Sequence, residues 1–489
     1  MPKTASRSSR TTGSTKKTKK KTTQSRRTAP ADGKPFANYS EATHWLYDHI
    51  DVERARPSKV NPEHFKLDRM RAILSKMGDP QDTLTAVHIA GTNGKGSVSA
   101  MLSSALQACG CAVGTYTSPH LTDLRERIQI NGSPITHPAM TRALTAVASA
   151  AAAIPKKYGE PSFFEIMTAA AFGHLAEQAV DIAIIEVGLG GRLDSTNVIT
   201  PAVSAVASVA LDHTHFLGET PEKIAREKGG IFKAGVPALT FKQDKPVIET
   251  LRSVAEEAET KLEVVGKDID FSYRFEASPQ LGPHCRVGLT TNRVNFEHVP
   301  VPLPGEHQAL NCGLTLAIID KLVDRGIELP EARVFEGLAK TTIPGRMELI
   351  DVKPRVLLDG AHNPAAVEAL IKSIGAHVQY DSMIMIFGCA IDKDVEGLLK
   401  RVALGADKVV FTKAKANPRA CDPQDLHQRF EAMSPKMCQL APNIDQALSI
   451  AARAASRDDL IVVTGSFYLV GEAKKLLTSK LDKAAAARA

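Results

Sequence analysis

The stretch His88-Ile-Ala-Gly-Thr-Asn-Gly-Lys-Gly-Ser97 decides the fold, because it joins an apolar strand to a helix through a glycine-rich loop. Its glycines let the backbone curl and approach a phosphate closely. Amide groups at the start of the helix would point at the anion, while Lys95 supplies a positive charge and Ser97 a hydroxyl. The spacing departs from the common phosphate loop, since Gly96 separates Lys95 from Ser97. A turn without a ligand is the alternative, and we favour nucleotide binding.

Apolar runs of strand length alternate with helical segments along the chain. Such alternation predicts parallel sheets covered by helices on both faces, and buried parallel strands should read as continuous apolar runs. We therefore expect an α/β fold built on parallel sheets, in a larger domain that carries the phosphate loop and a smaller second domain. The expected strands are Leu84–Ala90, Asp181–Val187, Val203–Ala210, Val356–Leu358, Ser382–Phe387, Lys408–Phe411 and Leu460–Val463. The expected helices include Ser97–Ala108, Ala143–Ile154, Glu165–Gln178 and a helical stretch over Gln308–Ala339.

The chain divides into three segments by composition. Residues 1–35 are rich in Lys, Arg, Ser and Thr and cannot bury enough apolar surface to fold, so we predict a disordered basic tail. The larger domain is expected at 36–345 and the smaller one at 346–489, because a new strand–helix alternation begins after Pro344-Gly345. Clefts between domains are favoured ligand sites.

The net charge of +7 over 489 residues is located in the tail. Its first 30 residues hold ten Lys or Arg and no acid, so the remaining chain carries 51 basic and 54 acidic residues. We read the tail as a solvated extension in preference to a nucleic-acid contact, and expect at most weak binding of nucleic acid there. No run reaches the ~18 apolar residues that a membrane helix needs. Seven scattered cysteines favour reduced thiols, a cytoplasmic location and no metal cluster, and we expect a monomer.

The phosphate loop resembles that of the Mur ligase superfamily, and the glycine after Lys95 is similar to its folate branch, the folylpolyglutamate synthase and dihydrofolate synthase family. Further segments resemble that branch in the same order along the chain. They are Thr117-Ser-Pro-His-Leu121, Glu186-Val-Gly-Leu-Gly-Gly-Arg-Leu-Asp194, Leu211-Asp-His-Thr214, Arg226-Glu-Lys-Gly-Gly230, Pro344-Gly-Arg346 and Leu358-Asp-Gly-Ala-His-Asn-Pro364. This ordered set covers roughly residues 65–475 and leaves out the tail. It implies the Mur ligase architecture, which is a large P-loop-type parallel-sheet ATPase domain followed by a smaller Rossmann-like C-terminal domain.

Glu186 ends an apolar strand, where ligand groups of parallel sheets gather, and its carboxylate suits Mg²⁺. The resemblance implies that Ser118, Glu186 and His213 hold Mg²⁺, with room for a second cation, divalent or monovalent. Taken alone, His213 is more typical of a structural histidine. The resemblance also implies that Lys228 is carbamylated and acts in catalysis with Lys95 and His213. The alternative for Lys228 is an ion pair on a helix surface.

The same resemblance assigns the remaining site residues. It implies that ATP is bound by Thr92, Asn93, Gly94, Lys95, Gly96 and Ser97 and, across the cleft, by Asn311, Arg346, Asp359 and His362. It implies that the pterin-bearing substrate lies against Leu67, Arg69, Phe163, Phe164, Glu165, Gly191, Arg192 and Asp194. Core packing is the alternative for the two phenylalanines, and a linker ion pair is the alternative for Arg346. Arg125 or Arg127 is a further candidate for holding a substrate carboxylate.

These expectations define an ATP-dependent amide ligase that adds L-glutamate to tetrahydrofolate, to dihydropteroate, or to both. ATP would convert a carboxylate into an acyl phosphate, which the glutamate amine then attacks, with ADP and phosphate released. One alternative is a Mur-type ligase acting on a peptidoglycan precursor, which Gly96 and the Ser-Pro-His-Leu and Asp-Gly-Ala-His-Asn-Pro segments disfavour. Another is a nucleotide-dependent nucleic-acid-binding protein that uses the basic tail.

Overall fold

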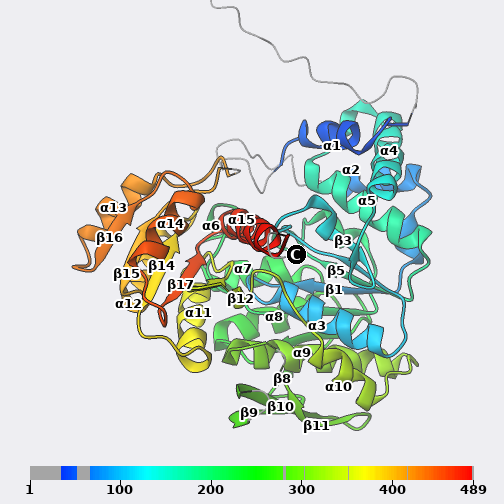
Figure 1. Cartoon of the computed structure of the whole chain (residues 1–489). Coiled ribbons are helices and arrows are strands. Elements are labelled where there is room, and N and C mark those ends of the chain that lie inside the picture. The colour runs from blue at the N-terminus through cyan, green and yellow to red at the C-terminus, as the bar shows by residue number, and fades with distance from the viewer. Residues whose placement is uncertain are drawn as a thin grey trace, which may run out of the picture.

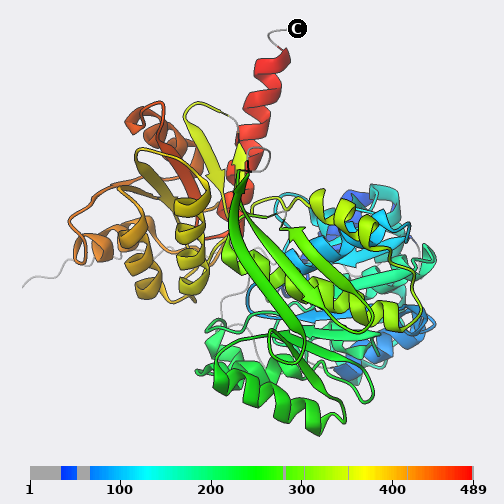
Figure 2. The same ribbon diagram turned by 90° about the horizontal axis from the view of Figure 1, so that it is seen from below.

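The computed structural model describes residues 35–51, 67–278, 282–301, 303–350, 352–415 and 417–486. The predicted basic tail falls almost wholly outside these residues, so its prediction is not tested. The described chain forms two lobes, each built around its own mainly parallel sheet, and the smaller lobe stands beside the larger one (Figures 1 and 2). Within the described ranges, no helix has the length and apolar character needed to cross a membrane.

The larger lobe contains an eight-stranded sheet in the order β4-β3-β2-β5-β1-β6-β7-β8. Strands β2, β5, β1, β6, β7 and β8 run parallel, and β3 and β4 extend one edge antiparallel. The strands are β1 Ala86–Ala90, β2 Val113–Tyr116, β3 Ile128–Ile130, β4 Ser133–Pro134, β5 Ile182–Glu186, β6 Val203–Val206, β7 Ala238–Phe241 and β8 Leu262–Val265. The central strands β1 and β5 are buried along their whole length, which explains their unbroken apolar sequence.

Helices cover both faces of this sheet. Val87 and Ile89 of β1 belong to a core shared with α3, α9 and α10. The opposite face packs on α1, α2, α4 and α5 at one end and on α7 and α8 at the other. The helices are α1 Tyr39–Tyr47, α2 Leu67–Lys76, α3 Lys95–Ala108, α4 His137–Ala153, α5 Phe163–Glu177, α6 Thr214–Leu217, α7 Pro221–Gly229, α8 Lys245–Glu257, α9 Glu306–Asp324 and α10 Glu331–Ala339, with short 3-10 turns at Pro80–Thr83, Leu124–Arg127, Lys156–Tyr158 and Ser195–Val198.

A separate antiparallel sheet, which we did not predict, joins the larger lobe in the order β11-β10-β9. Its strands are β9 Asp270–Ser278, β10 Gly282–Thr290 and β11 Asn295–Pro300. Leu289 and Phe296 are buried against the core that contains α9. One face of this sheet is exposed, so its strands alternate between apolar and polar residues and lack the apolar runs by which we identified strands.

The smaller lobe has a six-stranded sheet in the order β12-β13-β17-β14-β15-β16, in which only β12 is antiparallel. Helices α11, α12 and α13 pack on one face, and α14 and α15 on the other. Figure 2 shows α15 extending beyond the lobe. The elements are β12 Glu348–Ile350, β13 Arg355–Leu358, α11 Pro364–His377, β14 Met383–Phe387, α12 Val395–Gly405, β15 Lys408–Phe411, α13 Pro423–Glu431, β16 Met437–Leu440, α14 Ile444–Ala454, β17 Leu460–Thr464 and α15 Phe467–Ala486.

The structure confirms the α/β fold class and every strand predicted from an apolar run. Several boundaries differ from expectation. Helix α4 begins at His137, six residues before the predicted Ala143, and the predicted helical stretch Gln308–Ala339 is two helices, α9 and α10, separated by residues 325–330. Strand β6 ends at Val206, four residues before the predicted Ala210. Helix α3 begins at Lys95, two residues before the predicted Ser97, because Gly94 takes the left-handed conformation (φ 89°) that starts the helix.

Candidate active site

A cleft lies between the lobes and is lined by residues of both. On the larger lobe it follows the carboxyl ends of β1, β5 and β6, where ligand sites of parallel sheets form. The predicted residues on its wall are Thr92, Asn93, Gly94, Lys95, Gly96, Ser118, Phe164, Glu186, Asp194, His213, Lys228, Arg346 and His362. Segments of the chain that are far apart in sequence therefore meet in one place.

The glycines of the phosphate loop are packed so closely against their neighbours that two of them leave no room for a Cβ atom. A Cβ at Gly91 would lie 2.9 Å from Cβ of Ala207, and a Cβ at Gly94 would lie 2.5 Å from Oδ1 of Asn311. Both glycines have positive φ. Asn311 is buried in α9 directly behind the loop, and Ser97 is buried in the first turn of α3. The loop thus curves as predicted, with the free amides of the α3 amino terminus at its base.

Hydrogen bonds within the larger lobe fix the loop further. The Thr92 hydroxyl donates to the carbonyl of Ala210 (3.0 Å) and accepts from the Ala210 amide (3.1 Å). The Lys95 ammonium donates to the carbonyl of Gly91 (3.0 Å) and lies 3.9 Å from a carboxylate oxygen of Glu186. The Lys95 side chain is consequently folded back over its own loop. A phosphate bound in the loop would replace the Gly91 carbonyl as the partner of the Lys95 ammonium.

The predicted cation ligands line the same part of the cleft. Glu186 closes β5 and is 4% exposed, so a cation would compensate a carboxylate that is otherwise balanced by Lys95. His213 takes a left-handed backbone conformation (φ 49°) just before α6. Burial, and then the nearby Lys393 ammonium, lower the pKa of His213 to about 3, which keeps its ring nitrogens neutral. With the Ser118 hydroxyl, these donors fit a Mg²⁺ ion that keeps some water ligands.

Lys228 projects from the last turn of α7 and is 5% exposed. Burial, followed by the charge of Lys95, lowers its pKa to about 7. The ion pair on a helix surface, considered from the sequence, is therefore wrong for this residue. A buried lysine with a pKa of about 7 keeps about half of its amine neutral at pH 7, and the neutral amine is a nucleophile.

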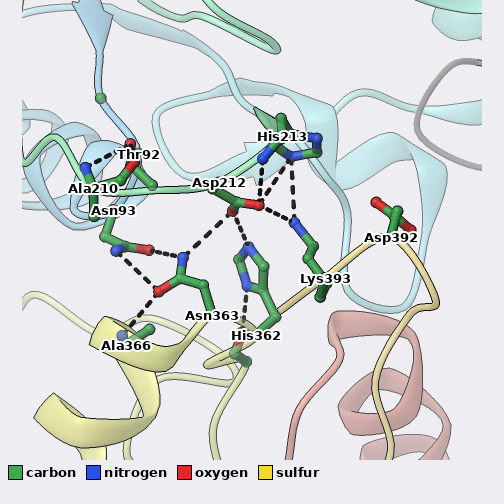
Figure 3. A network of polar contacts seen from close by, with 12 residues as sticks. Thr92, Asn93, Ala210, Asp212, His213, His362, Asn363, Ala366, Asp392 and Lys393 are labelled. Atoms are coloured by element: carbon green, nitrogen blue, oxygen red, sulfur yellow. Dashed lines mark hydrogen bonds and ion pairs between the residues drawn. The ribbon is translucent and has the colours of Figure 1, made fainter. Parts of the chain in front are cut away.

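A network of polar contacts spans the cleft at Asp212 (Figure 3). From the smaller lobe, the Lys393 ammonium lies 2.5 Å from Oδ1 of Asp212, and Nε2 of His362 lies 3.4 Å from its other oxygen. Burial alone would raise the pKa of Asp212, but His213, Lys393 and His362 together bring it well below its usual range. Asp212 is therefore an anion shared between the two lobes.

The same network ties the smaller lobe to the phosphate loop. The amide nitrogen of Asn363 donates to Oδ1 of Asn93 (3.0 Å), and that of Asn93 lies 3.4 Å from Oδ1 of Asn363 (Figure 3). Asn363 is also the N-cap of α11, where it accepts from the amide of Ala366 (2.9 Å). One side chain thus begins a helix of one lobe and contacts the phosphate loop of the other.

Arg346 and His362 line the cleft from the smaller lobe. The Arg346 guanidinium lies 4.5 Å from the centre of the Phe467 ring, which orients it by a cation–π contact. The linker ion pair considered from the sequence is not what holds it. Asp359 does not line the cleft; its carboxylate accepts from the amides of Met347 (2.9 Å) and Ala361 (2.8 Å). Asp359 thereby fixes the segments that carry Arg346 and His362.

The adjacent phenylalanines at the start of α5 face different ways. Phe164 lines the cleft, and Gly188 gives it room, since a Cβ there would lie 2.3 Å from the ring. Phe163 is fully buried, stacks on Tyr47 (5.5 Å) and lies under the guanidinium of Arg127. Core packing therefore describes Phe163, and a ligand contact remains open for Phe164.

Other residues predicted to contact the substrate lie behind the cleft wall. Arg69 and Glu165 form a buried ion pair of 2.8 Å, and Glu165 also caps α5 through Ser162. Leu67 begins α2 and is half-buried. None of these three lines the cleft in the described part of the chain. Arg125 is paired with Asp123 at 2.7 Å.

The loop after β5 is shaped by Asp194, which lines the cleft and accepts hydrogen bonds from the amides of Gly188 (3.1 Å) and Leu189 (2.8 Å). Gly191 permits a close approach to α7, since its Cβ would lie 2.7 Å from the carbonyl oxygen of Lys228. Arg192 points away from the cleft wall and pairs with Glu227 (2.9 Å) at the surface. Gly191 and Arg192 thus shape the loop around the site.

Sequence reasoning missed several residues of the smaller-lobe wall, including Lys393, Asn417, Arg419 and Ser466. Lys393 follows the buried strand β14, and this position at the end of a parallel strand was a usable signal. Arg419 and Asn417 lie in an irregular connection before α13 and gave no such signal. Asp212 and Asn363 lie in two of the segments that resemble the folate branch. The contact that each makes with the opposite lobe could not be predicted from the sequence.

Comparison with known proteins agrees with this geometry. The model of the Mur ligase middle domain matches residues 89–319, and that of the Mur ligase glutamate ligase domain matches residues 345–467. The chain is 33% identical over 445 residues to the dihydrofolate synthase/folylpolyglutamate synthase of Bacillus subtilis, covering 90% of this chain and 100% of that protein.

Solved structures resemble it over the same range. A Mycobacterium tuberculosis folylpolyglutamate synthase complexed with ADP superposes with a TM-score of 0.80 at 31% identity, covering 90% of this chain and 98% of the other. Escherichia coli FolC in complex with DHPP and ADP superposes with a TM-score of 0.78 at 28% identity, covering 93% and 99%.

The two lobes, the phosphate loop and both matched domains define a Mur ligase. Within that class, the chain belongs to the folylpolyglutamate synthase/dihydrofolate synthase family of acid–amino-acid ligases.

Proposed function

We propose that this protein is an ATP-dependent ligase that adds L-glutamate to a folate, to dihydropteroate, or to both. The observation that carries the proposal is the cleft in which Lys95 and the phosphate loop of one lobe face Arg346 and His362 of the other. Relatives named for these two reactions, and the relatives solved with ADP, support it. The peptidoglycan-type and nucleic-acid-binding alternatives have no comparable support.

The residues of the cleft suit a two-step reaction. A substrate carboxylate attacks the γ-phosphorus of ATP, an O–P bond forms, the bond to ADP breaks, and an acyl phosphate results. The glutamate amine then attacks the acyl carbon, an amide bond forms and phosphate leaves. Lys95 and the amides at the start of α3 stabilise the charge on the transferring phosphoryl group, and the cleft limits access of water to the acyl phosphate.

Mg²⁺ belongs to the proposal as the cation of Ser118, Glu186 and His213, with a second cation site close by. Bound there, it would neutralise charge on the phosphates of ATP. Glu186 supplies the negative charge and His213 a neutral nitrogen, as described above. With Glu186→Gln, the Mg²⁺ concentration that gives half-maximal activity should rise strongly; an unchanged requirement would remove Glu186 from the cation site.

We also propose that Lys228 is carbamylated. Its amine has a pKa of about 7, so a large fraction is neutral at physiological pH and able to attack CO₂. The neutral amine attacks the carbon of CO₂, an N–C bond forms as one C=O π bond opens, and the nitrogen releases a proton to solvent. The product is a carbamate anion beside Lys95. After incubation with ¹³C-bicarbonate, a carbamate resonance should appear that Lys228→Ala lacks. Absence of this resonance together with full activity of Lys228→Ala would refute the assignment.

The decisive assay incubates the full chain with ATP, Mg²⁺ and L-glutamate plus either dihydropteroate or tetrahydrofolate. We expect phosphate release that depends on glutamate, and a product heavier than the acceptor by one glutamate residue. Activity with one acceptor or with both decides between a monofunctional and a bifunctional enzyme. Glutamate-independent phosphate release with both acceptors, without amide product, would overturn the proposed function.

Three further predictions complete the proposal. We place the division between the domains near residue 345, at the start of the matched glutamate ligase domain. We expect the enzyme to act in the cytoplasm, which fits the free thiols of all seven cysteines. We expect it to act as a monomer, since both walls of the cleft come from one chain.

A further inference from the structure

Two cysteine side chains of the smaller lobe face each other close behind the cleft. Cys389 lies just after β14, and Cys421 lies two residues before α13. Their sulfur atoms are 3.8 Å apart. Both side chains are buried, with 2% and 4% exposure. No step of the proposed ligase reaction uses either thiol.

The backbone holds this pair in register. The amide of Cys421 donates to the carbonyl of Cys389 (2.9 Å), and the amide of Ile391 donates to the carbonyl of Arg419 (2.8 Å). Ala390 and Ala420 form an antiparallel bridge between the two hydrogen bonds. Residues that face each other in such a pair have Cα atoms about 4.5–5.5 Å apart, and a disulfide accepts about 4.4–6.8 Å. A disulfide can therefore form without unfolding the lobe.

We propose that Cys389 and Cys421 are an oxidisable dithiol whose conversion to a disulfide slows the ligase reaction in the adjacent cleft. The oxidant is a hydroperoxide, of which hydrogen peroxide is the smallest. The Cys421 thiolate attacks one peroxide oxygen, the O–O bond breaks and hydroxide leaves, giving a sulfenic acid. The Cys389 sulfur then attacks the Cys421 sulfur, the S–O bond breaks and water leaves. Two thiols are oxidised and one peroxide is reduced to two waters.

The order of these steps follows from the contact between the thiols. The hydrogen bond from the Cys389 thiol lowers the pKa of Cys421, although burial opposes this. The same contact and burial raise the pKa of Cys389 well above its usual range. Cys421 is thus the sulfur that ionises, and the thiolate is the reactive form of cysteine.

Closure of the disulfide would act on the cleft through the segments that carry the cysteines. These segments also carry Ala390, Lys393 and Arg419, which line the cleft. Lys393 lies four residues after Cys389 and makes the 2.5 Å contact with Asp212 of the larger lobe. Formation of an S–S bond of about 2.05 Å brings the two sulfurs closer than they are in the dithiol. A misplacement of ~1 Å at an active site costs up to ~10²-fold in rate, and we expect a roughly ten-fold lower kcat.

The test exposes the full-length protein to hydrogen peroxide and follows two readouts in the same samples. After alkylation of the remaining thiols and digestion, mass spectrometry should find a peptide pair joined through Cys389 and Cys421. The kcat of the ligase assay should fall in proportion to that crosslink and recover with dithiothreitol. The matched control is the triple variant Cys109→Ser, Cys111→Ser and Cys438→Ser, which removes the partly exposed thiols and should keep the full response.

Cys421→Ala and Cys389→Ala should each abolish both the crosslink and the reversible loss of activity. The inference can still be refuted if these variants fold poorly, because the crosslink itself is measured on the wild-type chain. It is overturned if peroxide oxidises Cys109 and Cys111 without joining Cys389 to Cys421, or if the crosslink forms and kcat stays the same. The kcat readout rests on the proposed function, whereas the crosslink does not. A crosslink in a chain without ligase activity would therefore refute only the proposed function.

Discussion

The two walls of the cleft are held in different ways. On the larger lobe, the phosphate-loop residues Thr92 and Lys95 find partners in their own lobe: Thr92 exchanges hydrogen bonds with Ala210, and Lys95 donates to the Gly91 carbonyl. On the smaller lobe, Lys393 and Asn363 reach across the cleft to Asp212 and Asn93. The first wall is therefore preorganised whatever the position of the lobes, while the second is complete only when they meet. Substitutions on the first wall should affect the chemistry, and those on the second should affect closure.

The largest effect is expected for Lys95→Ala on the preorganised wall. The substitution removes the cation beside the transferring phosphoryl group, and loss of such a group costs at least ~10²–10³-fold in kcat. Stability should change little, because among the described residues the ammonium has polar contacts with the Gly91 carbonyl and, at 3.9 Å, with Glu186 alone. The measurements are kcat from phosphate release and the urea midpoint of unfolding.

Lys245→Ala is the matched control, since Lys245 is 86% exposed on α8 and pairs only with Glu249. It should leave both kcat and the midpoint unchanged. A Lys95→Ala enzyme with kcat within three-fold of wild type would contradict the role of the phosphate loop, and with it the description of the first wall.

The next effect is expected for Asp212→Asn, which removes the anion shared by the lobes. Lys393, only 8% exposed, would then keep a buried cation beside a neutral amide, which favours separation of the lobes. We expect a ~30–150-fold lower kcat/KM, by analogy with the loss of a buried charge-pair partner at about 2–3 kcal/mol. The second readout is the radius of gyration in small-angle X-ray scattering, which should increase.

Asp320→Asn is the control for this substitution. Asp320 is also a buried carboxylate, but its partner Arg293 (2.6 Å) lies in the same lobe. This variant should lose stability while kcat and the radius of gyration of the folded protein stay unchanged. A lower kcat/KM for Asp212→Asn with an unchanged radius of gyration would mean that Asp212 acts in the chemical step and not in closure of the lobes. That result would contradict the distinction between the two walls at this residue.

The same difference explains how far the sequence could predict the site. On the first wall, the residues that line the cleft as expected are consecutive in the phosphate loop or stand at the end of an apolar strand, as Glu186 does. The contacts of the second wall join residues 181 positions apart for Lys393 with Asp212, and 270 for Asn363 with Asn93. Nothing local in the chain specifies such pairs, since they depend on how one lobe sits against the other.

Local ambiguity accounts for the other differences between prediction and structure. Phe163 and Phe164 are neighbours of the same type, and only the orientation of α5 decides that one enters the core and the other the cleft. The antiparallel strands β9 to β11 bury few or none of their residues and intersperse apolar with polar side chains, so they lack the apolar runs that identified the parallel strands. The fold class was therefore predictable from the sequence, but the orientation of single side chains was not.

A smaller effect is expected at Asn363, which has two functions that can be separated. Asn363→Ser keeps an N-cap for α11 but is too short to reach Asn93, so it should raise KM for ATP by ~3–10-fold with stability almost unchanged. Asn363→Ala loses both functions and should also cost about 1 kcal/mol of stability. The measurements are KM for ATP and the free energy of unfolding in urea.

The comparison between the two variants is itself the control for Asn363. If Asn363→Ser binds ATP like the wild type and only Asn363→Ala is impaired, the residue serves α11 alone. The contact with Asn93 would then be a consequence of closure and would not help to maintain it.

The smallest effect is expected for Arg192→Ala, which tests where the first wall ends. The sequence resemblance placed Arg192 at the substrate, whereas the structure pairs it with Glu227 at the surface, with its side chain 54% exposed. An exposed ion pair contributes about 0–1 kcal/mol, so kcat and KM for the folate substrate should stay within two-fold, with a similarly small change in stability. Glu227→Ala should give the same result, because it removes the same pair from the other side.

A KM that rises ten-fold or more in Arg192→Ala, but not in Glu227→Ala, would mean that Arg192 leaves its partner to hold a substrate carboxylate. In that case part of the larger-lobe wall forms only on binding, and preorganisation would be limited to the phosphate loop and the end of β5.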